Sequence, residues 1–286
     1  MKNKIKVIIF ILCVLIYGFL KESTLLTNLS NVEDVAVSES LLKVHFIDVG
    51  QADSIFIELP NKETMLIDAG NNSDDETVVN YINELNYDTI NYLIGTHPHE
   101  DHIGGLDTVI DTFNIQNIYM PKVVYSTKTY EDVLLAVKNK GLKINNAKAG
   151  TNIIDSKNLK IDIIAPANDY YVSTNNYSAV VKITYNDKSF LFMGDAENLS
   201  EDEITANVKA DVIKIGHHGS SSSTSNEFLS KVSPSYAIIS VGNNNDYGHP
   251  HEEIINLLNK SNIKVYRTDL SGTIIIKSDG YNINIE

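Results

Sequence analysis

Three histidines and two carboxylates occupy six consecutive positions of this 286-residue chain, in the segment His97-Pro98-His99-Glu100-Asp101-His102. Imidazole nitrogens and carboxylate oxygens are side-chain ligands that zinc and similar divalent cations take in proteins. The whole chain has only eight histidines, so three of them in one short segment indicate a metal site rather than a polar surface loop. In such a turn His97 and His99 can point toward one ion, while Asp101 and His102 point toward a second.

Apolar patterns place this segment between a strand and a helix. Tyr92-Leu93-Ile94 precedes it and is typical of a buried strand, and Leu106, Val109, Ile110 and Phe113 follow it with helical spacing. A strand end with a helix starting behind it makes a rigid platform. We therefore expect the ligands to be held by regular structure rather than by a flexible loop.

Other histidines and carboxylates also follow apolar runs. Asp68 follows Met65-Leu66-Ile67, Asp195 follows Phe190-Leu191-Phe192-Met193-Gly194, and His217-His218 follow Val212-Ile213-Lys214-Ile215. A carboxylate at the end of a buried strand, such as Asp195, can bridge two cations. Adjacent side chains at a strand end diverge, so we expect one histidine of the pair to ligate a metal and the other to face the substrate.

These segments together resemble a known family. His97-x-His99-x-Asp101-His102 resembles the HxHxDH signature of the metallo-β-lactamase superfamily. The chain also resembles its ComEC-like branch, the metallo-hydrolase domain of bacterial DNA-uptake proteins that is also found in stand-alone exported hydrolases. The motifs that carry this resemblance occur in order as Phe46–Ser54, Leu66–Gly70, Phe192–Glu197, His217–Ser220 and Tyr247–His251. The match runs from about Lys43 to the C-terminus and is specific for fold and metal, and weaker for substrate.

Strands and helices interleave along the chain without the even alternation of a doubly wound sheet. This order predicts an α/β fold of two mixed sheets packed face to face with outer helices, and the resemblance names it as the metallo-β-lactamase αβ/βα sandwich. Helices are expected at 75–85, 130–140, 226–232 and 252–259. Strands are expected at 43–49, 54–59, 64–67, 92–94, 159–164, 179–185, 189–193, 212–215, 236–241, 264–267, 273–277 and 281–285.

The resemblance implies a role for each residue of the metal site. The ligands of the first metal would be His97 and His99, those of the second Asp101, His102 and His218, and the bridge between them Asp195. Asp68 would support the site by orienting a ligand without binding a metal itself. The expected cofactors are thus two divalent ions, with zinc as the first choice and manganese as the alternative.

Three residues are expected to act in catalysis. By the resemblance, His217 would contact a phosphate, although the roles of His217 and His218 could be reversed. Asp101 would accept a proton from the attacking water. His249, which precedes Pro250 and a helix, is a candidate for stabilising the transition state or protonating the leaving group; its alternative role is packing at the helix entry.

The chain departs from hydrolytic members such as lactamases and glyoxalases in one respect. Those members place a further histidine between the HxHxDH loop and the bridging aspartate, whereas no histidine lies between His102 and His217 here. Asn175-Asn176-Tyr177-Ser178 stands in its place, and the ComEC-like branch likewise has a small polar residue there. The first metal would therefore have two histidines and the bridging carboxylate, with an open position for water or substrate.

Two neighbouring metal ions can activate water and clamp the attacking and leaving oxygens of a phosphoester. We therefore expect a dinuclear metal-dependent hydrolase of phosphodiester bonds, a phosphodiesterase or nuclease, with a phosphoester substrate and nucleic acid as one candidate. The alternatives are a choline-phosphate esterase, a lactonase-type hydrolase, and a non-catalytic metal-binding accessory module. No protein partner is evident.

The charge balance bears on the substrate. The chain has 23 Lys and Arg against 37 Asp and Glu, a net charge of −14, which argues against a long basic nucleic-acid-binding surface. Bound metal ions could still attract a phosphate locally. Five lysines cluster in the sequence between the metal loop and the second half of the chain, and they form either a local basic patch or a solvated helix face. They are Lys122, Lys128, Lys138, Lys140 and Lys143. Cys13 is the only cysteine, so a thiolate metal site is excluded.

The N-terminus has the pattern of an export signal. A basic start at 1–6 is followed by an apolar run at 7–20 and by Lys21, so residues 1–21 are interpreted as a signal peptide or membrane anchor. Residues 22–41 form a polar linker, and 42–286 form the hydrolase domain. We expect an exported protein that is either membrane-anchored on the extracellular face or secreted.

Overall fold

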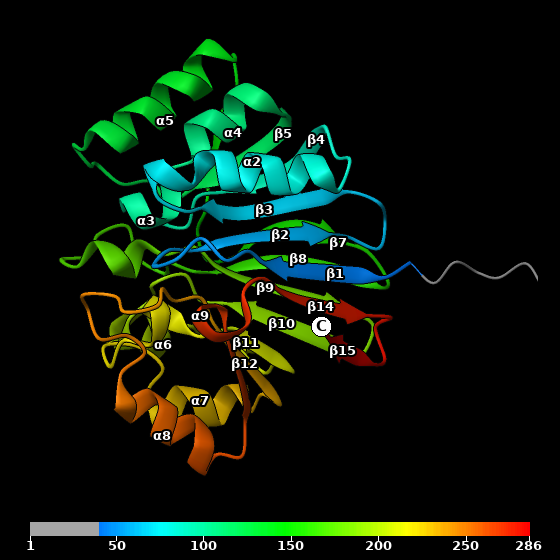
Figure 1. Ribbon diagram of the computed structural model, residues 1–286, viewed down its shortest axis with the longest axis vertical. Helices are drawn as coiled ribbons and strands as arrows, with labels where there is room; N and C mark the ends of the chain where they lie inside the picture. The colour runs from blue at the N-terminus through cyan, green and yellow to red at the C-terminus, as the bar shows by residue number, and fades with distance from the viewer. Residues whose placement is uncertain (1–39) are drawn as a thin grey trace, which may run out of the picture. The chain divides into compact units, whose positions relative to one another are not determined.

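Strands rich in Ile, Val and Phe assemble into two mixed sheets in the computed structural model, which describes residues 40–286 (Figure 1). Within that part, the eight strands of the first sheet are, in spatial order, β15 (Ile283–Ile285), β14 (Ile274–Ser278), β1 (Leu42–Phe46), β2 (Ser54–Glu58), β3 (Thr64–Ala69), β4 (Thr89–Ile94), β5 (Asn114–Met120) and β6 (Ile144–Asn146). The seven strands of the second are β13 (Lys264–Arg267), β12 (Tyr236–Ile239), β11 (Val212–Lys214), β10 (Lys188–Phe192), β9 (Val180–Tyr185), β8 (Leu159–Ala165) and β7 (Thr151–Asp155).

Each sheet combines an antiparallel part with a parallel part. In the first sheet β14, β1, β2 and β3 pair antiparallel, and β3 to β6 pair parallel. In the second sheet β7 to β10 pair antiparallel, and β10 to β13 pair parallel. Ligands in open α/β sheets bind beyond the carboxyl ends of parallel strands. The neighbouring pairs β3–β4 and β10–β11 are therefore the places where a site is expected.

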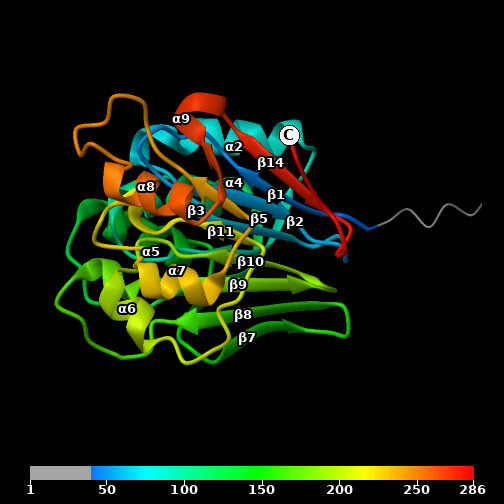
Figure 2. The same cartoon turned by 90° about the horizontal axis from the view of Figure 1, so that it is seen from below.

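Helices cover the outer faces of both sheets (Figures 1 and 2). Those on the first sheet are α2 (Asp75–Glu84), α4 (Leu106–Thr112) and α5 (Lys128–Asn139), and those packed on the second are α7 (Asn226–Val232) and α8 (Glu252–Lys260). The connections contain short helical segments: η1 (Asn72–Asp74), α3 (Glu100–Ile103), η2 (Thr174–Tyr177), α6 (Asn198–Glu203), η3 (Gly216–Gly219) and α9 (Thr268–Ser271).

The main core lies between the sheets. Side chains of both inner faces meet there, and the rings of Phe46 on β1 and Phe192 on β10 lie 6.1 Å apart. Two further apolar layers fill the space between each sheet and its helices. The expected α/β sandwich of two mixed sheets with outer helices is thus confirmed. Burying apolar faces on both sides of each sheet fixes the strand ends, and with them the side chains that follow.

Several elements were not predicted from the sequence. Strand β5 carries polar residues at 114, 116 and 117 between buried Ile115, Ile118 and Met120, so its apolar signal is interrupted. Strand β7, at the edge of the second sheet, contains no fully buried residue, and edge strands need no continuous apolar pattern. Pairing with neighbouring strands, rather than local composition, determines both.

The predicted leader and nearly all of the predicted linker lie at residues 1–39, outside the described residues, so the domain boundaries stay a prediction. The described part forms one compact unit, Ser40–Glu286. Within these residues, no helix combines the length and the apolar character that crossing a bilayer requires.

Candidate metal centre

Histidines and carboxylates at or after the ends of four strands lie close together. Asp68 lies at the end of β3, the 97–102 segment follows β4, Asp195 follows β10, and the 217–218 pair follows β11. Gly104, behind the metal loop, donates its backbone N–H to Gly70 O at 2.8 Å. An added Cβ at Gly104 would lie 2.2 Å from the backbone of Asn71, so only glycine allows this approach. The sequence therefore holds α3 tightly against the end of β3.

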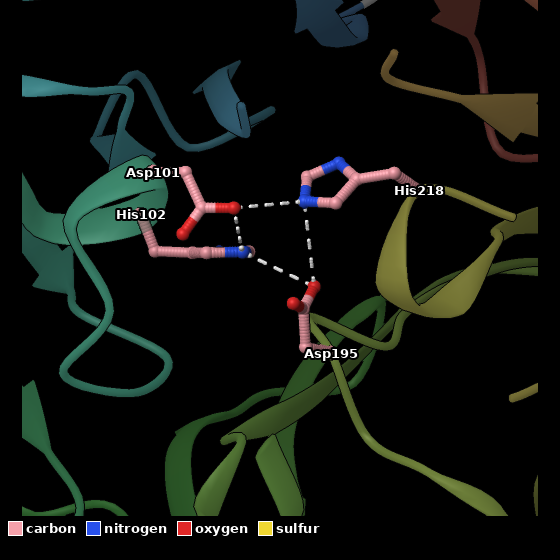
Figure 3. A group of neighbouring side chains, drawn as sticks. All are labelled: Asp101, His102, Asp195 and His218. Atoms are coloured by element: carbon pink, nitrogen blue, oxygen red, sulfur yellow. Dashed lines mark ion pairs between the residues drawn. The ribbon is translucent and has the colours of Figure 1, made fainter. Parts of the chain in front are cut away.

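The second cluster, named after the second metal expected from the sequence, consists of Asp101, His102, Asp195 and His218, whose side chains point toward one another (Figure 3). His102 Nε2 lies 3.1 Å from Asp195 Oδ1, and His218 Nε2 lies 3.7 Å from the same oxygen. His218 Nε2 also lies 3.3 Å from Asp101 Oδ2. These are the four residues expected around the second metal, with Asp195 as the bridge.

The first cluster, named after the first metal expected from the sequence, consists of His97, His99 and Asp195. His97 Nε2 lies 3.0 Å from His99 Nδ1 and 3.8 Å from Asp195 Oδ2. The two carboxylate oxygens of Asp195 therefore face different clusters, Oδ1 toward His102 and Oδ2 toward His97. This is the geometry of a carboxylate between two cation sites.

Unpaired buried atoms test whether a cation fits. His102 Nε2, Asp195 Oδ1 and His218 Nε2 are all buried without a hydrogen-bond partner, although each such atom costs about 1–3 kcal/mol when left unsatisfied. All three belong to one cluster whose ligand atoms lie within 4.8 Å of one another. A divalent cation among them would satisfy all three, and nitrogen and carboxylate donors suit zinc. The residues present fit the metal.

Asp68 lies behind the cluster. Its carboxylate accepts hydrogen bonds from the backbone N–H of Thr96 at 2.8 Å and the Thr96 hydroxyl at 2.7 Å, and it lies 2.7 Å from His102 Nδ1. A proton held at Nδ1 leaves the lone pair of His102 Nε2, which faces Asp195, free to bind a metal. The structure thus places Asp68 where a residue that orients a ligand belongs, and this role stays a prediction.

The electrostatics of the cluster favour a cation. Burial alone would lower the pKa of His102, but the Asp195 and Asp101 carboxylates outweigh it and raise that pKa well above its usual range. Burial likewise acts to raise the pKa of Asp195, but His102 and His218 hold it well below its usual range. Burial instead lowers the pKa of His97, His99 and His217. Without metal, His102 and His218, whose pKa values are raised, therefore retain protons. A metal ion entering the centre would displace them.

The His217–His218 pair does not diverge as expected for a strand end. Both residues adopt left-handed backbone angles, with φ of 50° and 52°, so the alternation of an extended strand does not apply. His218 Nδ1 lies 3.0 Å from the carbonyl oxygen of Ser240, and its Nε2 faces Asp195 Oδ1. His217 Nδ1 lies 3.0 Å from the Ser222 hydroxyl, and its Nε2 lies 3.7 Å from Asp195 Oδ2. Both rings point at the same carboxylate.

A cavity of about 330 Å³ opens beside the clusters. Its lining residues are Gln51, His99, Glu100, Asp101, Asn175, Asp195, His217, His218, Tyr247 and His249. The His249 ring stacks on the exposed Tyr247 ring, with centroids 5.6 Å apart. Burial, together with the neighbouring His218 and His217, lowers the pKa of His249 to about 4. His249 is therefore a neutral imidazole at neutral pH.

Some residues of the centre were not assigned a role from the sequence. Lys214, at the end of β11, is buried with its Nζ 2.6 Å from Asp53 Oδ2; the available signal was a single lysine within an apolar strand. Asn175 and Tyr247 line the cavity, and both lie in segments that the sequence singled out. His251, which caps the start of α8, accepts the backbone N–H of Ser221 through Nδ1 at 3.0 Å.

Comparisons with known proteins agree with this geometry. Residues 47–242 match the family model described as the metallo-beta-lactamase superfamily. ComE operon protein 3 of Bacillus subtilis is 33% identical in an alignment of 252 residues that covers 81% of this chain and 32% of that protein. Competence protein ComA of Neisseria gonorrhoeae is 27% identical in an alignment of 255 residues that covers 87% of this chain and 34% of that protein. The chain thus spans about a third of the length of these curated relatives.

A solved structure shows the same fold. CmlA, a diiron beta-hydroxylase from Streptomyces venezuelae, matches with a TM-score of 0.55 and 12% identity, covering 83% of this chain and 54% of that one. At this identity the similarity concerns the fold alone. The resemblance to ComEC-like proteins is confirmed by the sequence relatives, and the clusters have side chains that could hold divalent metal ions. The chain belongs to the metallo-beta-lactamase superfamily.

Proposed function

We propose that this protein is a dinuclear metal-dependent hydrolase that cleaves phosphodiester bonds. The observation that carries the proposal is Asp195, whose Oδ1 faces His102 and whose Oδ2 faces His97. Two divalent ions, zinc first and manganese as the alternative, would supply an activated water and stabilise the attacking and leaving oxygens of an in-line displacement. The Asp195 bridge and its two clusters would hold the ions side by side.

Asp101 would accept a proton at the cavity. Asp101 borders the cavity with a side chain that is 32% exposed, and the neighbouring histidines hold its pKa well below the usual range against the upward effect of burial. Asp101 is thus anionic at neutral pH, and its position at the cavity, rather than its basicity, is the ground for assigning it as the acceptor of the proton of an attacking water.

His249 would donate a hydrogen bond rather than a proton. Gln51 Oε1 accepts the backbone N–H of Gly242 at 3.1 Å, which leaves the Gln51 amide nitrogen facing His249 Nδ1 at 3.4 Å. The neutral ring then carries its proton on Nε2. A neutral imidazole is a weak acid, so we assign His249 to stabilising a phosphoryl oxygen, not to protonating the leaving group.

The charge around the cavity favours a small, singly charged phosphodiester. The lining residues in the described part of the chain include Glu100, Asp101 and Asp195 but no lysine or arginine. Two of the five lysines that were candidates for a basic patch are also engaged elsewhere, since Lys128 pairs with Asp132 and Lys140 donates to the carbonyl of Phe113 at 2.8 Å. Attraction of the phosphate would thus come from the metals, and a nucleic-acid substrate would be a short single strand.

Hydrolysis assays test the proposal. The purified full-length chain is stripped with chelator and given zinc or manganese, and its turnover of bis-p-nitrophenyl phosphate and single-stranded DNA is measured beside Asp101→Ala and Asp195→Asn. We expect metal-restored hydrolysis that falls by at least about 100-fold in both variants. Turnover only of choline-phosphate esters would support an esterase, and turnover only of lactones would support a lactonase. A metal-loaded, folded protein that hydrolyses none of these would be an accessory module.

We also propose that the protein acts outside the membrane. The basic start and apolar run of residues 1–21 support an export signal that either anchors the chain or is cleaved. Protease added to intact cells should degrade the anchored protein, or the protein should be found in the medium. Protection inside intact cells would contradict export.

A further inference from the structure

His217 occupies the position that a missing ligand of the first metal cluster would need. Two histidines and one carboxylate oxygen leave that cluster one donor short of the four that zinc usually takes. We propose that His217 Nε2 is the third nitrogen ligand of the first metal, beside His97, His99 and Asp195. This inference rests on the metal dependence of the proposed function, and it replaces the phosphate contact that the sequence led us to expect for His217.

The first reason to assign His217 as a ligand is the distance between its Nε2 atom and the Asp195 carboxylate. His217 Nε2 lies 3.7 Å from Oδ2, and His97 Nε2 lies 3.8 Å from the same oxygen. On the other side, His218 Nε2 lies 3.7 Å from Oδ1. Ligand atoms around a tetrahedral zinc, with bonds of about 2.0–2.1 Å, lie roughly 3.4 Å apart. His217 Nε2 is therefore as far from the Asp195 oxygen of the first cluster as His218 Nε2 is from the Asp195 oxygen of the second.

The second reason is that the Nδ1 atom of each histidine ring has a hydrogen-bond partner. A ligating histidine has its other ring nitrogen held by a hydrogen-bond partner that sets the orientation of the ring. His102 Nδ1 is held by Asp68 at 2.7 Å, and His218 Nδ1 is held by the Ser240 carbonyl oxygen at 3.0 Å. His217 Nδ1 lies 3.0 Å from the Ser222 hydroxyl, which can donate or accept, and 3.5 Å from the Asn175 amide nitrogen, which can only donate. When the Ser222 hydroxyl accepts the Nδ1 proton, the lone pair of His217 Nε2 is free to bind a metal, as it is in His102 and His218.

The backbone explains how two adjacent histidines can serve two metals. In an extended strand, neighbouring side chains point to opposite faces. His217 and His218 instead adopt left-handed angles (φ 50°, ψ 48° and φ 52°, ψ 22°), which residues other than glycine rarely adopt. The turn directs both rings to Asp195, one to each oxygen. Such disfavoured angles persist where the surroundings impose them, and they cluster at functional sites.

His217 must move slightly when the ion binds. The atoms that lie within 4.8 Å of one another include those of His97, His99 and Asp195 but not that of His217, so its ring has to shift inward. Its side chain is 24% exposed and borders the cavity, which leaves room for that shift. By contrast, the side chain of His218 is 2% exposed and is already in place.

The two sites would then differ in donor type. The first would have three nitrogens and one carboxylate oxygen, and the second would have two nitrogens from His102 and His218 and two oxygens from Asp101 and Asp195. Imidazole suits zinc, whereas carboxylate suits manganese. The first site should therefore bind zinc in preference to manganese, and the second should accept either ion.

Metal titration tests the inference without relying on turnover. Chelator-stripped full-length protein is titrated with zinc against a chromophoric competitor, and bound zinc is counted by elemental analysis. The variants are His217→Ala, His217→Asn and Ser222→Ala. The control is His249→Ala, which removes a cavity histidine that lies in neither cluster. Circular dichroism of each stripped protein establishes that it is folded.

We expect wild type and His249→Ala to bind two zinc ions. His217→Ala should retain one ion and lose the other, with an affinity at least about 100-fold weaker, since altering only an outer partner of a ligand costs 10–100-fold. Ser222→Ala should weaken the same site by about 10-fold. If His217→Ala does not fold, His217→Asn, which keeps a polar side chain of smaller reach, should show the same loss.

Two zinc ions bound to folded His217→Ala with wild-type affinity would overturn the inference, whatever the effect of this substitution on hydrolysis. A wild type that binds fewer than two ions would also overturn it. A wild type that binds two ions, with one lost in His217→Ala, but that hydrolyses no phosphodiester would support the inference and contradict only the proposed function.

Discussion

Lys214 Nζ lies 2.6 Å from Asp53 Oδ2 behind the metal centre, and the two side chains are 0% and 2% exposed. Asp53 Oδ1 in turn lies 3.5 Å from His218 Nδ1, so this buried ion pair adjoins a histidine of the second cluster. The ammonium of Lys214 also donates to the Ile215 carbonyl at 2.9 Å. The pair balances a carboxylate that would otherwise be an uncompensated charge in the interior.

Lys214→Met should therefore destabilise the protein strongly. Removing one partner of a buried ion pair leaves the other charge unpaired and lowers the free energy of unfolding by about 3–5 kcal/mol. The double variant Lys214→Met with Asp53→Asn removes both charges and should recover part of that loss. Urea unfolding in chelator measures the stability without a contribution from bound metal. A single variant within about 1 kcal/mol of wild type would show that the pair carries little stability.

Asp68→Asn should weaken the second metal site by about 10–100-fold, because it removes the charged partner that holds His102 Nδ1. Asp68 has a φ of 59°, and asparagine tolerates left-handed angles well, so the backbone should be kept. Zinc competition titration measures the effect. Asp48→Asn, at an exposed carboxylate that accepts the Gly50 N–H at 3.2 Å, is the control and should bind zinc as wild type does. Equal affinities in both variants would refute the orienting role.

Gly104→Ala should disrupt the metal loop, whereas Gly95→Ala should be tolerated. A Cβ at Gly104 would lie 2.2 Å from the backbone of Asn71 and of Asn72, so α3 must shift, at a cost of about 3 kcal/mol or more, at the upper end of overpacking effects. A Cβ at Gly95 meets only side-chain ends at 3.1–3.3 Å, including Leu106, and should cost about 1 kcal/mol. Thermal melts and zinc titration of both variants check this. Equal melting temperatures would contradict it.

Much of the fold, and the side chains that make up the two clusters, could be predicted from the sequence because the signals are local. The apolar run before each ligand marks a strand, and the HxHxDH segment places four donors within one turn. The meeting of residues 97–102 with Asp195 and the 217–218 pair depends on the pairing of strands far apart in the chain, and only the family resemblance anticipated it.

The orientations inside the site could not be predicted. The left-handed backbone at His217 and His218 has only a weak local signal, because histidine adopts a positive φ more often than most residues but still rarely. The buried charge of Lys214 is stable only beside Asp53, a contact between residues 161 positions apart by their numbers. Tertiary contacts therefore decide which neighbour each polar group faces.

The last prediction concerns acid stability at a site away from the metals. Glu58 lies 3.0 Å from Lys43 Nζ and 3.1 Å from His45 Nε2, and it accepts the Tyr87 hydroxyl at 2.8 Å. Burial acts to raise the pKa of Glu58, but the hydrogen bonds of His45, Tyr87 and Lys43 outweigh it and lower that pKa from 4.5 to about 2. The folded state thus binds the proton more weakly than the unfolded state.

The sign of the pH effect follows from this depressed pKa. The stabilisation from Glu58 is fully present above the unfolded pKa of 4.5 and is lost as the pH falls toward 2. Glu58→Gln cannot titrate, so the difference in unfolding free energy between wild type and this variant should narrow between pH 6 and pH 3. Urea unfolding in chelator measures that difference, in which the other carboxylates cancel. A constant difference over this range would mean that the Glu58 pKa is not lowered, because only a group with different pKa values in the two states makes stability depend on pH.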